Sequence, residues 1–529
     1  MRDNDCMQVA SPIGLKPEPR KLGRTLVRNS AANIVRLGVT SLVAILLPVF
    51  LTHRLPVATY GAWILILQLG AYVSYLDFGV QTAVAKYIAE YEAMGDLNGC
   101  RRCASVAAAI MLAASGIGVF LTLGLAWQVP SLFRDMPVEL LHDVRVSVLF
   151  VGISLAINLA TSVFSAIFLG LQKYQIPMIA SVMNRLVYAT VIYVAVTLHC
   201  SLVTMAIVTA IVNVLTALLQ FGLWKKLAGH IEVSFRSVDF VMAKQMLAYC
   251  AVLTVWSACM LVISGIDVTI VGHYAFQDVA FYSIATSPSN LILMVIGAGL
   301  GPLLPAASAL SVDRSSEQMG ALLLKSTRYS TIILLASAVP VLVGAYPLVR
   351  LWVGPYYAEH SIFFLRVLLI ANIVRNLLGP YATMVVAVSR QKVATFAAIT
   401  EAVVNLCCSI LFARHLGAKG VALGTLVGSV AGIAVHFAVS MHYTQSNLKI
   451  SRLDLFVKGI LRPALMAIPT VLLAPYWWRQ GPTALDLRIW TLWFVTTLLL
   501  LWFGSLTASD RAAVTTSLRS KLKSRSVQA

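Results

Sequence analysis

Long apolar windows, each about the length of a membrane-spanning helix, recur along the whole chain. A helix needs roughly 20 apolar residues to cross the hydrocarbon core, and windows of that length fit helices rather than the alternating strands of a barrel. The pattern predicts roughly fourteen spans. Their approximate extents are 30–51, 61–83, 104–127, 146–169, 176–198, 202–224, 246–270, 280–305, 329–348, 362–388, 393–413, 420–442, 456–475 and 486–507.

Composition agrees with a polytopic membrane protein. The 529 residues are 59% hydrophobic and only 12% charged, with a mean hydropathy of +0.84. A soluble globular protein carries about twice that charged fraction. We therefore expect an all-α membrane protein and exclude a soluble enzyme.

Positive charge is concentrated in alternate loops and in both tails. Basic groups lie at Arg101–Arg102, in the loop Lys225–Gln245 and near Lys449–Lys458, whereas the turns at His199 and His273–Asp278 carry almost none. Cytoplasmic loops are rich in Lys and Arg, so these groups mark the inner side and place both termini in the cytoplasm. The net charge of +19 then needs no nucleic-acid partner.

The longest basic loop divides the chain into two groups of spans. We expect a cytoplasmic tail (1–28), an N-lobe of six spans (29–224), an inter-lobe loop (225–245) and a C-lobe of six spans (246–442), followed by two further spans (456–507) and a second cytoplasmic tail (508–529). A weak echo links Tyr60-Gly61 with Phe281-Tyr282 about 221 residues later, which is typical of a parallel structural repeat in transporters.

Arginines inside the spans are the most informative residues. Arg185 and Arg375 lie near the middle of their spans, and Arg36 lies about two turns above the cytoplasmic end of the first, on one face with Asn33. A guanidinium cannot lose its charge, so each needs an anion, water or a partner in the membrane. We predict that Arg36, Arg185, Arg375 and Asn33 bind an anionic substrate, since arginine holds phosphate with two parallel hydrogen bonds.

An internal ion pair is the alternative for one of these residues. Glu401 lies at middle depth in the span after Arg375, and the two helices form a hairpin, so the two side chains could meet. Asp77, Asp267 and Glu401 are also candidates for binding a coupling proton or sodium ion. The alternative for Asp77 and Asp267 is a capping or packing role beside Gly79 or Gly265. Cys100 and Cys103 have no second Cys/His pair nearby, so we expect no metal and no cofactor.

Several segments are similar to those of a known family. They are Asn33 to Arg36, Tyr60-Gly61, Leu76-Asp77-Phe78-Gly79, Gly170-Leu171-Gln172-Lys173-Tyr174, and Asn405 followed by Leu416-Gly417-Ala418-Lys419-Gly420. With them the chain resembles the polysaccharide-transporter (Wzx-type) flippases of the multidrug/oligosaccharidyl-lipid/polysaccharide exporter superfamily. The resemblance runs from about residue 25 to about residue 445.

The resemblance implies two six-helix lobes in a V around a central cavity, plus two extra C-terminal helices. It also implies a non-enzymatic transporter that moves a polyprenyl-diphosphate-linked oligosaccharide, such as an O-antigen or exopolysaccharide repeat unit, across the bacterial inner membrane by alternating access. Its partners would be that lipid-linked substrate, the membrane lipids, and the polysaccharide polymerase and export machinery.

Two other functions stay open from the sequence. One is an ion-coupled multidrug or organic-cation antiporter of the same superfamily, although the deep charges here are mainly arginine. The other is a membrane glycosyltransferase or polysaccharide polymerase, which would need catalytic groups on a large external loop. The longest outer loops, 128–145 and 349–361, are short for that role.

Overall fold

The computed structural model describes residues 19–301, 303–312, 316–388, 390–478, 485–506, 508, 510–512 and 516, and the first side chain it describes is that of Arg36. Within these residues every regular element is a helix, which confirms the all-α membrane fold expected from the sequence. Apolar side chains dominate the helices, as expected where lipid is the main solvent.

The first bundle consists of α2 to α7, with α1 packed along α6. The elements are α1 (Pro19–Arg54), α2 (Val57–Ala71), the 3₁₀ turn η1 (Tyr72–Asp77), α3 (Val80–Met94), α4 (Leu97–Leu132), α5 (Val138–Gly170), α6 (Gln175–Thr197) and α7 (Leu202–Leu227).

The second bundle consists of α9 to α18, and α8 leads into it. The elements are α8 (Phe240–Met260), the π-helical turn η3 (Leu261–Gly265), α9 (Asp267–Tyr274), α10 (Val279–Leu300), α11 (Leu303–Val312), α12 (Ser316–Val343), α13 (Ala345–Val353), α14 (Pro355–Asn376), α15 (Gly379–Ala387), α16 (Gln391–Leu416), α17 (Ala418–Val435), the π-helical turn η5 (His436–Ser440) and α18 (Met441–Thr444). Short turns η2 (Phe235–Ser237) and η4 (Phe276–Asp278) precede α8 and α10.

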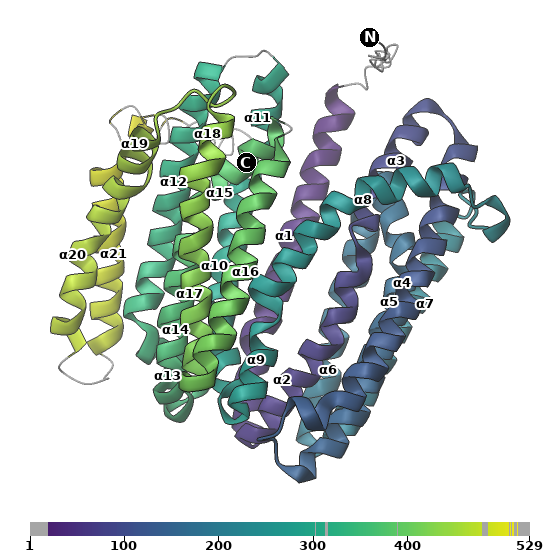
Figure 1. The fold of residues 1–529 in the computed structure, drawn as a ribbon, viewed down its shortest axis with the longest axis horizontal. Helices are drawn as coiled ribbons and strands as arrows, with labels where there is room; N and C mark the ends of the chain where they lie inside the picture. Colours follow the sequence, from purple (N-terminus) through teal and green to yellow (C-terminus); the bar gives the residue numbers. More distant parts are fainter. Residues whose placement is uncertain are drawn as a thin grey trace, which may run out of the picture.

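A C-terminal pair of helices lies outside the second bundle, beside α12 (Figure 1). The first helix of the pair runs without a gap through α19 (Arg452–Asp454), the π-helical turn η6 (Leu455–Leu461) and α20 (Arg462–Trp478). The second is α21 (Leu485–Ser505).

The expected count of fourteen spans is not confirmed. Eleven helices in the described part are long and apolar enough to cross a membrane, and the bent pair Phe240–Ala251 and Leu253–Gly265 makes twelve. Over the residues whose side chains are described, the C-terminal pair adds one shorter apolar helix, Thr491–Ser505.

The two bundles converge at one end and diverge at the other (Figure 1). At the converging end, which carries α9 and α13, a continuous apolar core includes residues of both bundles, such as Trp63 and Phe133 from the first and Val279 and Tyr357 from the second. A Cβ at Gly61 would lie 3.6 Å from the backbone nitrogen of Ala280, so α2 and α10 approach closely there. The segments that echo each other in the sequence are thus in contact.

Helix α8 connects the bundles by packing on both. Its first half joins the core of the first bundle through Met242, Met246 and Cys250. The helix then bends by 42° around residue 252 and continues through η3 into the second bundle, against α16. Any movement of one bundle relative to the other must therefore involve this bent helix.

Candidate functional site

Arg185 occupies the middle of α6. Its side chain is half-buried, its Nε is buried with no hydrogen-bond partner, and the guanidinium lies 5.8 Å from the ring centroid of Tyr188. No carboxylate in the described part of the chain forms an ion pair with it. A guanidinium over an aromatic face keeps its charge and its donors available to a further ligand.

The residue before Arg185 is held by the neighbouring helix. Asn184 Nδ2 donates to Thr216 Oγ1 on α7 at 2.7 Å. This bond fixes the rotation of α6 at that level and therefore the direction in which Arg185 leaves the helix.

Arg36 lies on α1, the helix that packs along α6. The rings of Phe50 and Tyr193 pack in a tilted arrangement, with their centroids 4.4 Å apart, and set the register of the two helices. Counting back at 1.5 Å per residue places Arg36 about 21 Å and Arg185 about 12 Å from that contact. Arg36 is half-buried and interacts with a neighbouring group. The side chain of Asn33 lies outside the described residues.

Arg375 is in the ion pair that the sequence left open as an alternative. Its Nε donates to Glu401 Oε1 at 2.5 Å, and its Nη1 donates to Asn372 Oδ1 at 3.1 Å. The side chains of Arg375 and Glu401 are 17% and 10% exposed, so the pair belongs to the interior of the second bundle. The ion pair therefore gives both residues a structural role, and this role accounts for their presence without substrate binding or ion coupling.

Asp77 lies where η1 gives way to α3. Phe78 and Gly79 both have left-handed backbones, with φ of 50° and 77°, and the Asp77 Oδ1 accepts from the amide of Gln81 in the first turn of α3 at 3.4 Å. A Cβ at position 79 would lie 2.7 Å from the Cβ of Leu253 on α8, so glycine is needed for the close approach as well as for φ. This geometry is that of a helix-capping carboxylate.

Asp267 is the predicted carboxylate that has a buried oxygen without a hydrogen-bond donor. It is 6% exposed at the start of α9. Its Oδ2 accepts from Thr425 Oγ1 on α17 at 2.9 Å and from the Tyr282 hydroxyl on α10 at 3.2 Å, while Oδ1 is buried with no hydrogen-bond partner. A buried oxygen with no donor can accept a proton or coordinate a cation.

The helix is interrupted just before Asp267, and side chains from both bundles donate hydrogen bonds to backbone carbonyls at this interruption. The carbonyl of Ile263 accepts from Asn405 Nδ2 of α16 at 3.1 Å, and that of Gly265 accepts from Gln68 Nε2 of α2 at 2.5 Å. Tyr72 of η1 also donates to the Gly265 carbonyl at 3.2 Å and bonds to the Thr269 hydroxyl. Gln68 and Tyr72 were not among the predicted site residues, although polar side chains inside an apolar window were a signal.

A row of glycines on α17 was also missed. Gly420, Gly424, Gly428 and Gly432 recur every four residues and face α16, where a Cβ at each would lie within 2.8 Å of an atom of that helix. The small-xxx-small spacing is a known signature of close helix packing in membranes. It positions Glu401 and Asn405, whose side chains face Gly432 and Gly428.

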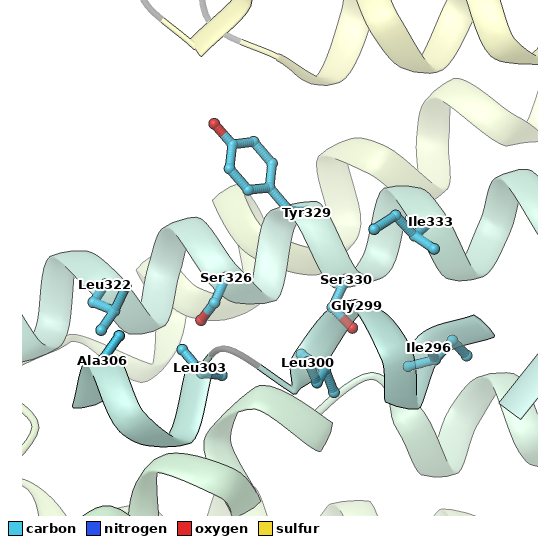
Figure 2. Close-up of a pocket in the computed structure, with 10 residues that line it drawn as sticks. All are labelled: Ile296, Gly299, Leu300, Leu303, Ala306, Leu322, Ser326, Tyr329, Ser330 and Ile333. Carbon is cyan, nitrogen blue, oxygen red and sulfur yellow. The ribbon is translucent and has the colours of Figure 1, made fainter. Parts of the chain in front are cut away.

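A separate apolar pocket of about 250 Å³ lies between α10, α11 and α12. Figure 2 shows Ser326 and Ser330 of α12 on the side that faces Leu300 and Leu303, whereas the ring of Tyr329 points away. The Tyr329 hydroxyl instead donates to Asp510 at 3.1 Å. None of the predicted site residues lines this pocket, and within the described residues no group of His, Cys, Asp or Glu could hold a metal ion.

Comparisons with known proteins agree with this architecture. The profile of the family described as "Polysaccharide biosynthesis protein" matches residues 26–311, more than half of the chain. No curated protein sequence matches at a significant level.

Solved structures share the fold at low sequence identity. The lipid II flippase MurJ in an inward closed conformation has a TM-score of 0.67 and 14% identity, covering 90% of this chain and 98% of its own. An inward-facing multidrug resistance MATE family transporter of the MOP superfamily has a TM-score of 0.65 and 19% identity, covering 79% and 99%. A MOP superfamily transporter from Pyrococcus furiosus, described as having a binding pocket of reverse polarity, has a TM-score of 0.56 and 18% identity, covering 81% of this chain and 96% of its own. The resemblance inferred from the sequence is thereby confirmed: the chain belongs to the polysaccharide biosynthesis protein family and has the fold of the MOP-superfamily transporters.

Proposed function

We propose that the protein is a flippase that moves a polyprenyl-diphosphate-linked oligosaccharide from the inner to the outer leaflet of the bacterial cytoplasmic membrane. The observation that carries the proposal is Arg185, a half-buried cation at mid-span with no carboxylate paired to it in the described part of the chain. The family match to polysaccharide biosynthesis proteins supports a glycan-containing cargo.

The charge of Arg185 favours an anionic cargo. A fixed cation in the low-dielectric interior is costly unless an anion or water reaches it, and a diphosphate offers oxygens spaced for the two parallel bonds that a guanidinium makes. Arg375 is left out of this site because Glu401 already supplies an anionic partner for its charge. Arg36, about 9 Å nearer the start of α1 by helical rise, would meet the same head group on its way in.

The arrangement of the bundles favours alternating access. The bundles are joined by an apolar core at the end that carries α9 and α13, and they diverge at the end that carries α3 and α11 (Figure 1). The basic segments at Arg101–Arg102 and Lys449–Lys458 lie at the diverging end, which we assign to the cytoplasm. In this state the head group would enter from the inside while the polyprenyl chain stays in lipid.

A cation gradient would drive the cycle through Asp267. Its buried Oδ1 has no donor, and its Oδ2 accepts from Tyr282 and Thr425, so one oxygen is held in place while the other can take a proton or a sodium ion. The other deep carboxylate of the second bundle, Glu401, is bound to Arg375. Arg185, by contrast, has no carboxylate paired to it in the described part of the chain, and a cation at that level of α6 disfavours the alternative of an antiporter for organic cations.

The decisive experiment measures on which leaflet the lipid-linked repeat unit accumulates. Spheroplasts of a deletion strain and of the complemented strain would be treated with a membrane-impermeant oxidant of sugar diols, and the labelled fraction of the lipid-linked glycan determined. We expect the glycan to accumulate unlabelled in the deletion strain and to be labelled after complementation. Labelled single repeat units in the deletion strain would instead indicate a polymerase, and unchanged polymer export would refute the proposal.

A further inference from the structure

The turn that carries Asp267 is also the point where the first bundle binds the second. In an uninterrupted α-helix the carbonyl of Gly265 would accept from the amide of Thr269. Here the amides of Thr269 and Ile270 both bond to the carbonyl of Ile266. The Gly265 carbonyl is thus free of the helix and accepts from the side chains of Gln68 and Tyr72, across the interface.

Each bundle supplies a partner for one of the carbonyls released by this break. Asn405 of the second bundle binds Ile263, and Gln68 of the first bundle binds Gly265. Because buried carbonyls need partners, the break is stable only while both bundles are in place. Separating the bundles at this level would leave the Gly265 carbonyl, a buried group, without its donors.

Asp267 lies two residues from Gly265 and two from Thr269, on the same short segment. Its carboxylate faces the other way, into the second bundle, toward Thr425 and Tyr282. A change of ligand on Asp267 that shifts the start of α9 must therefore also shift the two groups that Gln68 and Tyr72 hold.

We propose that Gln68 and Tyr72 are positioning residues that latch the first bundle to the Gly265–Thr269 turn and that occupancy of Asp267 sets how strongly this latch holds. The inference rests on the ion-coupling part of the proposed function. It adds the structural connection by which a cation at Asp267 would act on the contact between the bundles. Cation exchange at Asp267 would loosen or tighten three hydrogen bonds between bundles, and the converging end would open or stay shut accordingly.

The test measures the distance between the bundles at the converging end in the purified full-length protein in lipid nanodiscs. Spin labels would be introduced through noncanonical amino acids at Val138 and Leu351. Val138 is the first residue of α5 and is 81% exposed, and Leu351 lies within α13 and is 86% exposed. Native cysteines such as the exposed Cys407 would then not interfere. Double electron–electron resonance spectroscopy then gives the distribution of distances between the two labels.

The latch variants are Gln68→Leu and Tyr72→Phe, which remove the donors and keep the side-chain volume. A net hydrogen bond contributes about 1 kcal/mol, so the population with separated bundles should rise about fivefold for each and more for the pair. The matched control is Tyr381→Phe, which removes a tyrosine–threonine bond to Thr444 within the second bundle, at 2.8 Å, and should leave the distribution unchanged. Distributions equal to the wild type in both latch variants, or an equal change in the control, would overturn the latch.

The link to Asp267 is tested by a double-mutant cycle with the same labels. Asp267→Asn should change the separated population in the wild-type background and have little effect once Gln68→Leu and Tyr72→Phe are present. An equal effect in both backgrounds would show that Asp267 does not act through the latch. Neither measurement uses the lipid-linked cargo, so failure here is distinct from failure of the flippase proposal.

Discussion

Arg375 of α14 and Glu401 of α16 form an ion pair of 2.5 Å inside the second bundle, and α17 closes over it. The glycine at position 432 makes this possible, because a Cβ there would lie 2.8 Å from Glu401 Oε2. The pair is thus built into the packing of three helices, and it gives an anionic partner to a cation that the sequence alone could not distinguish from Arg185.

Breaking this pair should destabilise the protein strongly. Glu401→Gln leaves the buried Arg375 without its anion, and removing one partner of a buried pair costs about 3–5 kcal/mol. We expect a clear fall in the thermal unfolding midpoint of the purified protein, measured by intrinsic tryptophan fluorescence in detergent. Replacing both residues, as Arg375→Met with Glu401→Leu, should recover much of the loss.

The matched control for Glu401→Gln is an exposed pair. Asp454 and Lys458 are 2.6 Å apart on one helix with side chains 48% and 58% exposed. Solvent screens such a pair, so Asp454→Asn should change the free energy of unfolding by less than about 1 kcal/mol. A loss as large as that of Glu401→Gln would show that burial is not the cause.

The sequence predicted the fold class and the positions of most spans because apolar length is a local property. It could not predict that α8 bends by 42° and packs on both bundles, since the bend depends on contacts with Phe78, Gly79 and Asn405 far along the chain.

The candidate site was predictable only as a set of residue types. Helical spacing indicates which face carries Arg185 or Arg375, but not whether a carboxylate from another helix meets it. The predicted hairpin brings Glu401 close to Arg375, and the two side chains do form a pair. Asp77 and Asp267 looked alike in the sequence, and only their surroundings separate a cap for α3 from a buried oxygen without a donor.

Closer packing of α16 and α17 through glycine gives a second prediction. At Gly424 a Cβ would lie 2.4 Å from the backbone nitrogen of Ser409, so even alanine must push the helices apart. We expect Gly424→Ala to lower stability by about 1–3 kcal/mol, as overpacking does, and Gly424→Leu to prevent accumulation of folded protein. Detergent-solubilised monodisperse protein, measured by fluorescence-detected size exclusion, reports both.

A glycine that faces open space serves as the control. A Cβ at Gly222 on α7 would meet nothing within 4 Å. Gly222→Ala should therefore be neutral or slightly stabilising, since alanine favours the helix by about 1 kcal/mol. Similar losses for Gly222→Ala and Gly424→Ala would show that the α16–α17 contact is not the cause of the loss at Gly424.

Asp267 should determine the response to an ion gradient. In vesicles that carry the lipid-linked cargo, an imposed sodium or proton gradient should accelerate wild-type translocation, because the Oδ1 of Asp267 is a buried acceptor for the cation. Asp267→Asn cannot bind the cation as a carboxylate does, so we expect its translocation to be independent of either gradient. Asp77→Asn, which alters a helix cap, should keep the wild-type response. Loss of the response in Asp77→Asn alone would reverse the assignment.

Arg185 should determine how fast the cargo moves. Hydrogen bonds to a charged group contribute about 1.5–3 kcal/mol, so Arg185→Gln should slow translocation of the diphosphate-linked glycan by roughly tenfold to a hundredfold. Arg185→Lys keeps the charge but loses the planar fork, so its rate should lie between those of the wild type and Arg185→Gln.

The control for Arg185 is another arginine of the first bundle, which lies near a helix end rather than at mid-span. Arg145 is exposed near the start of α5, where its Nε donates to the Ala126 carbonyl at 3.2 Å. Arg145→Gln should translocate cargo at the wild-type rate. Because Arg185 has no carboxylate partner to leave behind in the described part of the chain, its variants should also keep the wild-type thermal stability, unlike Glu401→Gln. A normal rate in Arg185→Gln would remove this residue from the cargo path, and a large loss of stability would place it in the packing instead.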